Sequence, residues 1–172
     1  KENTNIIVLD ADLSKSTKTD TFKNVCPERF FNVGIAEQNL ISVGAGLAAA
    51  GKIPFVSSFA MFATGRAFEQ IRNAVCYPKL NVKVCATHAG ITVGEDGATH
   101  QSLEDISCMR TLPNMTVVVP ADERETEAVV EWAASYEGPV YVRLGRAGVD
   151  DVTAEGYTFV PGKSTTLVEG SD

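Results

Sequence analysis

Short apolar runs alternate with helix-like segments along most of this chain, and this alternation constrains the fold more than any other feature. Residues 5–9 read NIIVL, an unbroken apolar run typical of a parallel strand covered on both faces. Residues 36–50 instead repeat apolar side chains at helical spacing, and Gly51 ends the repeat. The remaining predicted strands cover 30–33, 54–57, 81–87, 115–119 and 139–144, and the remaining predicted helices cover 61–75, 102–109 and 123–136. About six strands separated by helices predict an α/β fold with a doubly wound, mostly parallel sheet and helices on both faces.

The predicted helix at 36–50 has two features that a structure can test. Leu40 and Val43 recur at helical spacing, so both are expected to face the core. Gly44 and Gly46 lower the intrinsic helix propensity of the segment. Close packing against a neighbouring element is the expected reason for both glycines.

Charge and composition exclude several classes of function. Lys and Arg total 15 against 22 for Asp and Glu, and the resulting net charge of -7 argues against nucleic-acid binding, which needs a basic face. No apolar run approaches the roughly 20 residues of a membrane-spanning helix, so no membrane association is expected. The four cysteines are widely spaced and include no CxxC pair, which favours reduced thiols in a cytoplasmic protein.

Both ends of the chain look cut rather than finished. The first predicted strand begins almost at once, without a leading Met. At the other end, residues 157–172 are rich in Gly, Ser and Thr and begin to look strand-like before they stop. We therefore expect a piece of a longer protein, with one domain at 1–150 and, at 151–172, a linker and the start of a truncated C-terminal domain.

The polar candidates for a functional site follow the predicted strands. In open parallel sheets, ligands bind beyond the carboxyl ends of the strands, so these loops are expected to meet at one edge. Both histidines of the chain fall in a single glycine-bearing loop after the fourth strand. The candidates are Asp12 and Ser16 after the first strand, Glu37 after the second, Phe59 and Phe62 after the third, His88, Asp96 and His100 after the strand at 81–87, and Arg146 after the last.

Glu37 is the most informative of these residues. It lies in the first turn of an otherwise apolar helix, where a carboxylate ordinarily compensates the helix dipole and stays in water. Aromatic residues such as Phe59 and Phe62 could surround it instead. Burial there would favour a carboxyl group able to hold or share a proton. Both interpretations are open on the residues alone.

Three segments, in this order, resemble the pyrimidine-binding domain of transketolases. They are FNVGIAEQN at 31–39, SSFAMF at 57–62 and THAGITVGEDGATHQ at 87–101, and the resemblance extends from about residue 5 to residue 146. The family uses thiamine diphosphate to transfer a two-carbon ketol unit from a ketose phosphate to an aldose phosphate. The resemblance therefore implies a transferase of the pentose phosphate pathway, here as the C-terminal-half subunit of a split transketolase.

The resemblance also implies roles for residues around the cofactor. Glu37 matches the glutamate that binds the N1′ atom of the cofactor's aminopyrimidine, where a shared proton favours the imino tautomer. Phe62 matches the aromatic residue that packs on the pyrimidine ring, and Phe59 matches a neighbour in the same pocket. Asp12 matches a residue near the cofactor. Gly65 stands where the family has a further aromatic residue, three positions beyond Phe62. That wall of the pocket is therefore either formed by another side chain or open.

A second group of residues matches the family's substrate-binding positions. His88 and His100 match histidines that contact the substrate and, with Glu37, are the expected catalytic residues. Asp96 matches the residue that reads a sugar hydroxyl. Phosphate binding is implied by two further matches, which are Ser16 and Arg146.

The chain lacks the Gly-Asp-Gly and Asn element that holds the diphosphate and its metal in this family. We therefore expect no metal ligands in this chain, and we expect a diphosphate-binding domain or subunit to complete the binding site for thiamine diphosphate and Mg²⁺. The chain alone should not catalyse. We also expect a homo-oligomer, with Ile35, Phe59 and Phe62 forming an exposed apolar patch in the isolated chain.

Two alternative functions remain open on the sequence. A 1-deoxy-D-xylulose-5-phosphate synthase domain also carries GIAEQ, but His88 and Glu95 stand where those enzymes usually have other residues. A non-catalytic scaffold module of the same fold is the other alternative. The joint presence of Glu37, both histidines, Asp96 and Arg146 counts against it, because a scaffold has no physical need of them.

Overall fold

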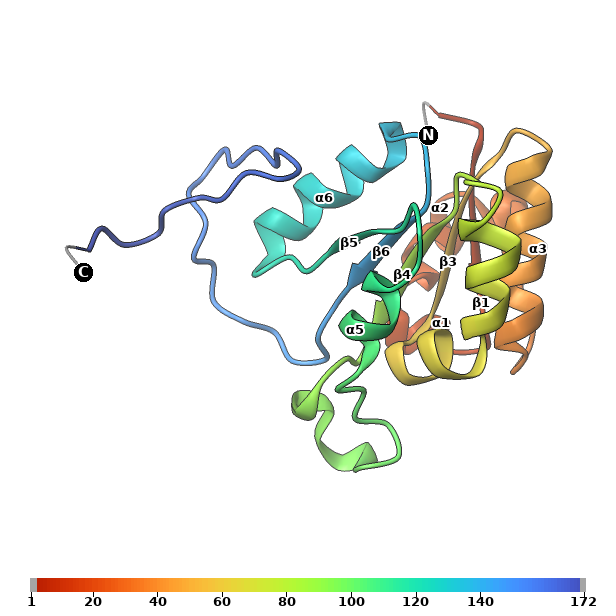
Figure 1. Ribbon diagram of the computed structural model, residues 1–172, viewed down its shortest axis with the longest axis horizontal. Coiled ribbons are helices and arrows are strands. Elements are labelled where there is room, and N and C mark those ends of the chain that lie inside the picture. Colours follow the sequence, from red (N-terminus) through yellow and green to blue (C-terminus); the bar gives the residue numbers. More distant parts are fainter. Residues whose placement is uncertain (1–2, 171–172) are drawn as a thin grey trace.

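The computed structural model describes residues 3–170 of the chain and confirms the predicted fold class. Six parallel strands form one sheet in the order β2-β1-β3-β4-β6-β5 (Figure 1). Each strand overlaps a segment predicted from its apolar run, although β3 extends beyond the predicted 54–57 at both ends. The strands are β1 (Ile6–Asp10), β2 (Phe30–Asn32), β3 (Ile53–Phe59), β4 (Lys83–Thr87), β5 (Thr116–Val118) and β6 (Val140–Arg143).

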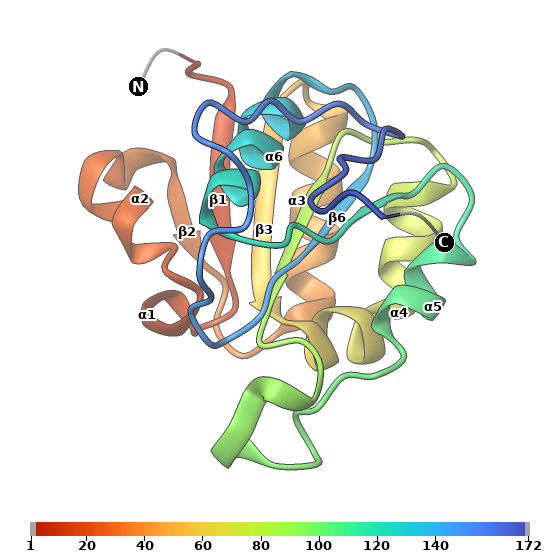
Figure 2. The same cartoon turned by 90° about the vertical axis from the view of Figure 1, so that its left-hand side faces the viewer.

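Helices cover both faces of the sheet (Figures 1 and 2). The helices are α1 (Ser14–Thr17), α2 (Asp20–Val25), α3 (Glu37–Ala49), α4 (Phe68–Gln70), α5 (Asp105–Arg110) and α6 (Glu123–Ser135). Helix α3 packs on β3 and on the segment around α4, whereas α2 and α6 lie on the opposite face. An apolar cavity of about 470 Å³ separates α2 from α6 above the central strands.

The structure adds two helices to the predicted set and corrects two of the predicted ones. The structure adds α1 and α2, which the pattern did not predict. The predicted helix at 61–75 is interrupted, because π-helical turns at Phe62–Arg66 and Ile71–Cys76 flank the short α4. The predicted helix at 102–109 begins only at Asp105, because the preceding segment pairs with the chain after β4 through the bridge between Ala89 and Ser102.

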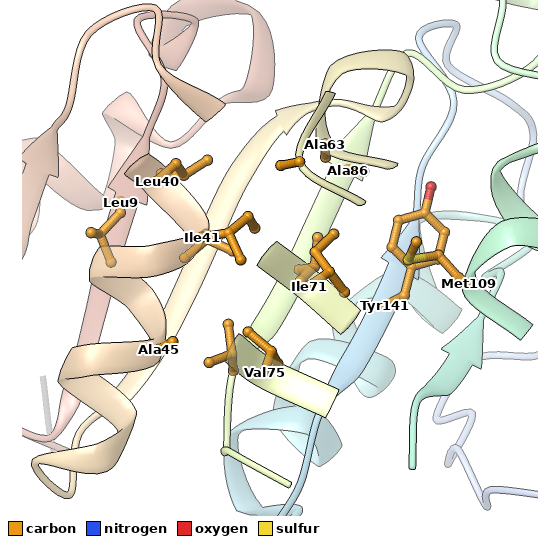
Figure 3. Close-up of a cluster of buried hydrophobic side chains, with 14 of the residues drawn as sticks. Leu9, Leu40, Ile41, Ala45, Ala63, Ile71, Val75, Ala86, Met109 and Tyr141 are labelled. Carbon is orange, nitrogen blue, oxygen red and sulfur yellow. The ribbon is translucent and has the colours of Figure 1, made fainter. Parts of the chain in front are cut away.

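The larger core lies between α3, the segment around α4 and the sheet (Figure 3). Leu9 on β1 and Ile41 on α3 are fully buried, as are Ile71 and Val75 on the neighbouring helical segment. Tyr141 of β6 lies beside Met109 at the other side of the same core. The core therefore fixes α3, and with it Glu37 at its first turn, against the sheet.

The two glycines of α3 differ in their surroundings. A Cβ at Gly44 would lie 2.8 Å from Val56 Cγ1, so the prediction of close packing is confirmed there. Gly46 has nothing within 4 Å of such a Cβ, so the same prediction is wrong for it. The buried face runs through Leu40, Ile41 and Gly44, while Val43 is 38% exposed, contrary to expectation. The inward face is thus turned by about one residue from the predicted one.

This difference gives a matched pair of substitutions. Gly44→Ala is expected to lower the free energy of unfolding by about 1–3 kcal/mol, because the added methyl group overpacks the contact with β3. Gly46→Ala in the same helix is expected to raise it by about 0.5–1 kcal/mol, because alanine favours the helix without any new contact. Urea unfolding of both variants measures the difference, and equal effects of the two would contradict the packing described for α3.

A buried network joins α5, β6 and the loop after β4. The Asp105 carboxylate is fully buried, and its Oδ2 accepts hydrogen bonds from Tyr141 Oη at 2.8 Å and Arg143 Nε at 2.7 Å. Burial first, and then the negative charge of Asp105, raise the pKa of Tyr141 above its ordinary value, so the hydroxyl stays a donor. A Cβ at Gly90 would lie 3.1 Å from Arg143 Nη2, so the arginine supports the loop closely.

Asp122 fixes the start of α6 and the chain that follows β6. Its Oδ1 accepts the backbone N–H of Glu125 as an N-cap, and its Oδ2 accepts the backbone N–H groups of Val152 and Thr153. The donor at Glu125, followed by those of Thr153 and Val152, holds the pKa of Asp122 well below its usual range. Residues 151–170 contain no helix or strand, and a domain boundary at 150 stays a prediction.

Two findings concern the classes excluded above. Within residues 3–170, no helix combines the length and apolar character needed to cross a bilayer. Over the same residues, all four cysteines are free thiols. Burial raises the pKa of Cys76 to about 11 and that of Cys85 to about 12, so neither is a ready nucleophile.

Candidate active site

Four aromatic rings gather where β3 and β4 end. Phe59 is the last residue of β3, Phe62 follows on the first π-helical turn, and His88 comes directly after β4. The Phe59 and His88 rings stack with centroids 3.9 Å apart and an interplanar angle of 18°. Phe62 lies 6.0 Å from Phe59 and 5.1 Å from His100, measured between ring centroids. We call Phe59, Phe62, His88 and His100 the aromatic cluster, and it unites both histidines as predicted.

His88 holds a backbone conformation that non-glycine residues seldom adopt. Its φ is +59°, the residue is 8% exposed, and its Nδ1 lies 2.9 Å from Thr87 Oγ1. Burial, followed by the charge of Arg146, lowers its pKa below the ordinary 6.5; His100 acts in the same direction, and Asp96 opposes them. The imidazole is therefore neutral at neutral pH and can accept a proton.

Glu37 is shielded from water, which favours the second of the two interpretations left open by the sequence, but its ion-pair partner was not predicted. The residue is 1% exposed at the N-terminus of α3. Its Oε2 lies 2.8 Å from Nη1 of Arg66, which is the last residue of the π-helical turn. The surroundings are thus not the purely apolar enclosure expected from Phe59 and Phe62. The only signal in the sequence was the departure at Gly65, immediately before this arginine.

Arg146, the predicted phosphate-binding residue, contacts the loop after β4. Arg146 donates to the carbonyl oxygen of Val93, forms an ion pair with Glu95 at 3.2 Å, and has Nη1 3.7 Å from Asp96 Oδ2. Positive φ angles at Gly94 (+77°) and Gly97 (+74°) allow the loop to turn around the guanidinium. The predicted substrate residues Asp96 and Arg146 are therefore neighbours, at the same edge as the aromatic cluster.

Two of the predicted residues are farther from this arrangement. Asp12 follows β1, has a φ of +67°, and accepts a hydrogen bond from Asn32 Nδ2 at 2.8 Å. Ser16 lies exposed on α1. Both are at the carboxyl edge of the sheet, but the contacts described for them go to β2 and α1 rather than to the aromatic cluster.

The expected apolar patch is only partly present. Ile35 is 78% exposed, as predicted. Phe59 is 7% exposed because His88 stacks on it, so the prediction that it contributes to an exposed patch is wrong. Phe62 is half-buried under Arg66 and against His100.

The arrangement suits a flat nitrogen heterocycle. A buried carboxyl group can bind a ring nitrogen through a shared proton, and the neighbouring phenyl rings offer apolar surface to an aromatic ring. Among residues 3–170, no three His, Cys, Asp or Glu side chains converge in a way that could hold a metal ion.

Comparisons with known proteins identify the family of the chain. Residues 1–150 match the family described as transketolase, pyrimidine binding domain. A protein of Methanocaldococcus jannaschii, named provisionally as a transketolase C-terminal section, is 58% identical over 174 residues, which cover 100% of this chain and 55% of that protein. The 6-deoxy-6-sulfo-D-fructose transketolase subunit SqwH of Clostridium sp. strain MSTE9 is 43% identical over 167 residues, which cover 97% of this chain and 52% of that subunit.

A solved structure gives the same result for the fold. A chain described as a split gene transketolase, inactive beta4 tetramer, superposes with a TM-score of 0.88 at 62% identity, covering 98% of this chain and 54% of that one. The present chain therefore spans about half the length of the relatives it matches.

Proposed function

The chain belongs to the transketolase pyrimidine-binding domain family, and on that premise we propose that it supplies the pyrimidine side of a transketolase active site. The family is one of thiamine diphosphate-dependent transferases that also need a divalent metal ion. The reaction proposed for the assembled enzyme is transfer of a two-carbon ketol unit from a ketose phosphate to an aldose phosphate. One observation carries the proposal, which is the burial of Glu37 at the edge of the sheet that holds the aromatic cluster.

The residues at this edge fit the cofactor's pyrimidine end. When bound, thiamine diphosphate supplies a nucleophilic ring carbon for the two-carbon unit. Glu37 would bind a pyrimidine nitrogen and hold or move a proton at its carboxylate oxygen. Phe62, with Phe59 behind it, would present an apolar face to the ring and exclude water. Asp12 is proposed to lie near the cofactor only because it matches a family position.

Substrate binding is proposed for the loop side of the site. The neutral imidazole of His88 can accept a proton, and His100 stands beside it over Phe62. Asp96 would accept a hydrogen bond from a sugar hydroxyl. Arg146 would bind the substrate phosphate after its pair with Glu95 opens, and Ser16 would bind phosphate from the other side of the edge.

Assembly is the remaining part of the proposal. The diphosphate and Mg²⁺ would be held by a diphosphate-binding subunit or domain, and the assembly would contain more than one copy of each. Pentose phosphates are the proposed substrates in the cytoplasm. Sulfonated ketoses are a second substrate class to test, because one relative is named for such a sugar.

Reconstitution tests this function. The full-length chain, its diphosphate-binding partner, thiamine diphosphate, Mg²⁺, a ketose phosphate and an aldose phosphate are expected to yield ketol transfer when mixed. Omitting either protein is expected to abolish the product. Consumption of pyruvate instead would favour a 1-deoxy-D-xylulose-5-phosphate synthase, and a stable complex without turnover would favour a scaffold; either result contradicts the proposal.

A further inference from the structure

Arg66 contacts two residues that were both predicted to hold the cofactor. Its Nη1 donates to Glu37 Oε2 at 2.8 Å. Its guanidinium carbon also lies 4.9 Å from the centroid of the Phe62 ring. The sequence resemblance gave this arginine no role, yet it joins the predicted proton-handling carboxylate to the predicted aromatic support.

The two partners of the ion pair differ strongly in exposure. The Glu37 side chain is 1% exposed, whereas that of Arg66 is 51% exposed. The arginine can therefore move its head group into water while the glutamate stays where it is. Its backbone is held in place, because the Arg66 carbonyl accepts from Gln38 Nε2 at 3.3 Å and the Ala67 N–H bonds Phe62 O in the π-helical turn.

The chemistry of these contacts resembles that of a bound heterocycle. A guanidinium is flat, donates N–H bonds to a carboxylate, and lies favourably on an aromatic face. An aminopyrimidine is also flat and can lie on an aromatic face, and its ring nitrogen can bind a carboxyl group through a shared proton, which takes the place of the arginine's charge. In its absence, a buried carboxylate needs another partner, because an unpaired buried charge is strongly unfavourable.

We propose that Arg66 is a placeholder for the cofactor's aminopyrimidine. In the free chain its guanidinium binds the Glu37 carboxylate and lies over the Phe62 ring, and on cofactor binding it is displaced into water. This inference rests on the function proposed above and adds a residue that sets cofactor affinity. It also accounts for the departure at Gly65, since the wall of the pocket is filled by the next side chain until the cofactor arrives.

Cofactor titration of the assembled complex tests the placeholder. Arg66→Met keeps an apolar stem near Phe62 but removes the guanidinium, so the cofactor no longer has to displace an ion pair. The dissociation constant of thiamine diphosphate, measured by calorimetry with Mg²⁺ present, is expected to fall about tenfold, as the loss of one charge-assisted hydrogen bond implies. Arg66→Lys keeps a cation without the flat fork and is expected to give an intermediate constant.

Arg72→Met is the matched control. Arg72 lies on the following helical segment and is exposed, and the one contact described for its side chain is a hydrogen bond to Asn73 Oδ1 at 3.3 Å. Its replacement is expected to leave the dissociation constant unchanged. Weaker or unchanged cofactor binding by both Arg66 variants would overturn the placeholder and assign Arg66 a holding or purely structural role.

A second readout serves if Arg66→Met assembles poorly. Without cofactor, the variant is expected to unfold at a lower temperature than the wild type, because Glu37 is left unpaired. Cofactor is expected to raise the unfolding temperature of the variant more than that of the wild type. An equal stabilisation of variant and wild type by cofactor would overturn the proposal. Glu37→Gln separates the two hypotheses. If this variant keeps ketol transfer intact, the proposed function fails. If it loses transfer but the Arg66 substitutions do not change cofactor affinity, only the placeholder is overturned.

Discussion

Glu37→Gln is expected to slow ketol transfer by the assembled complex about 10²- to 10⁴-fold, the range typical of losing a positioned acid–base group. Glutamine has nearly the same shape but cannot hold or release the proton at this position. Its amide oxygen can still accept from Arg66, so the fold and the assembly should be retained. Steady-state rates with thiamine diphosphate and Mg²⁺ at saturation measure the effect.

Glu69→Gln provides the control for that substitution. Glu69 is an exposed glutamate on α4 whose hydrogen bonds go to Gln70 and Asn73, outside the aromatic cluster. It should transfer at the wild-type rate. A Glu37→Gln complex that is folded, saturated with cofactor and as fast as the Glu69→Gln complex would remove Glu37 from the chemistry.

Asp105→Ala is expected to lower the free energy of unfolding by about 3–5 kcal/mol, as is typical when one partner of a buried ion pair is removed. The substitution leaves Arg143, whose side chain is 20% exposed, and the buried Tyr141 hydroxyl without their common acceptor. Because Arg143 lies against Gly90, the loop that carries both histidines should loosen as well. Urea unfolding of the full-length chain measures the stability, and hydrogen exchange measures the loop.

Two further variants show whether the effect comes from the buried pair. Tyr141→Phe removes one hydroxyl and leaves the Asp105–Arg143 pair, so a loss of only about 1 kcal/mol is expected. Asp150→Ala removes an exposed carboxylate and should have little effect. If Asp105→Ala were no more harmful than Tyr141→Phe, the network would not stabilise the fold in the way described.

The sheet could be predicted because each strand is marked by its own apolar run. The convergence of Glu37, His88 and His100 followed from one topological rule about the ends of parallel strands. The helix faces were harder to predict. Apolar spacing alone did not distinguish Gly44, where an added Cβ would meet β3, from Gly46, where an added Cβ would lie in open space.

Neither the interruption of the predicted helix at 61–75 nor the two ion pairs of buried carboxylates could be predicted, for physical reasons. The π-helical turn at Phe62–Arg66 departs from the 3.6-residue period on which helix prediction depends. It carries Arg66 to Glu37, 29 positions earlier in the chain, and no local pattern encodes such a contact. The pair of Asp105 with Arg143 spans 38 positions in the same way.

The position of Glu37 in the assembled, cofactor-bound enzyme is the most direct test of the proposed site. A structure of the complex with thiamine diphosphate and Mg²⁺ should place a Glu37 carboxylate oxygen within about 3.2 Å of a pyrimidine ring nitrogen, which is hydrogen-bond distance. A cofactor bound with its pyrimidine ring away from Glu37 and Phe62 would contradict the assignment.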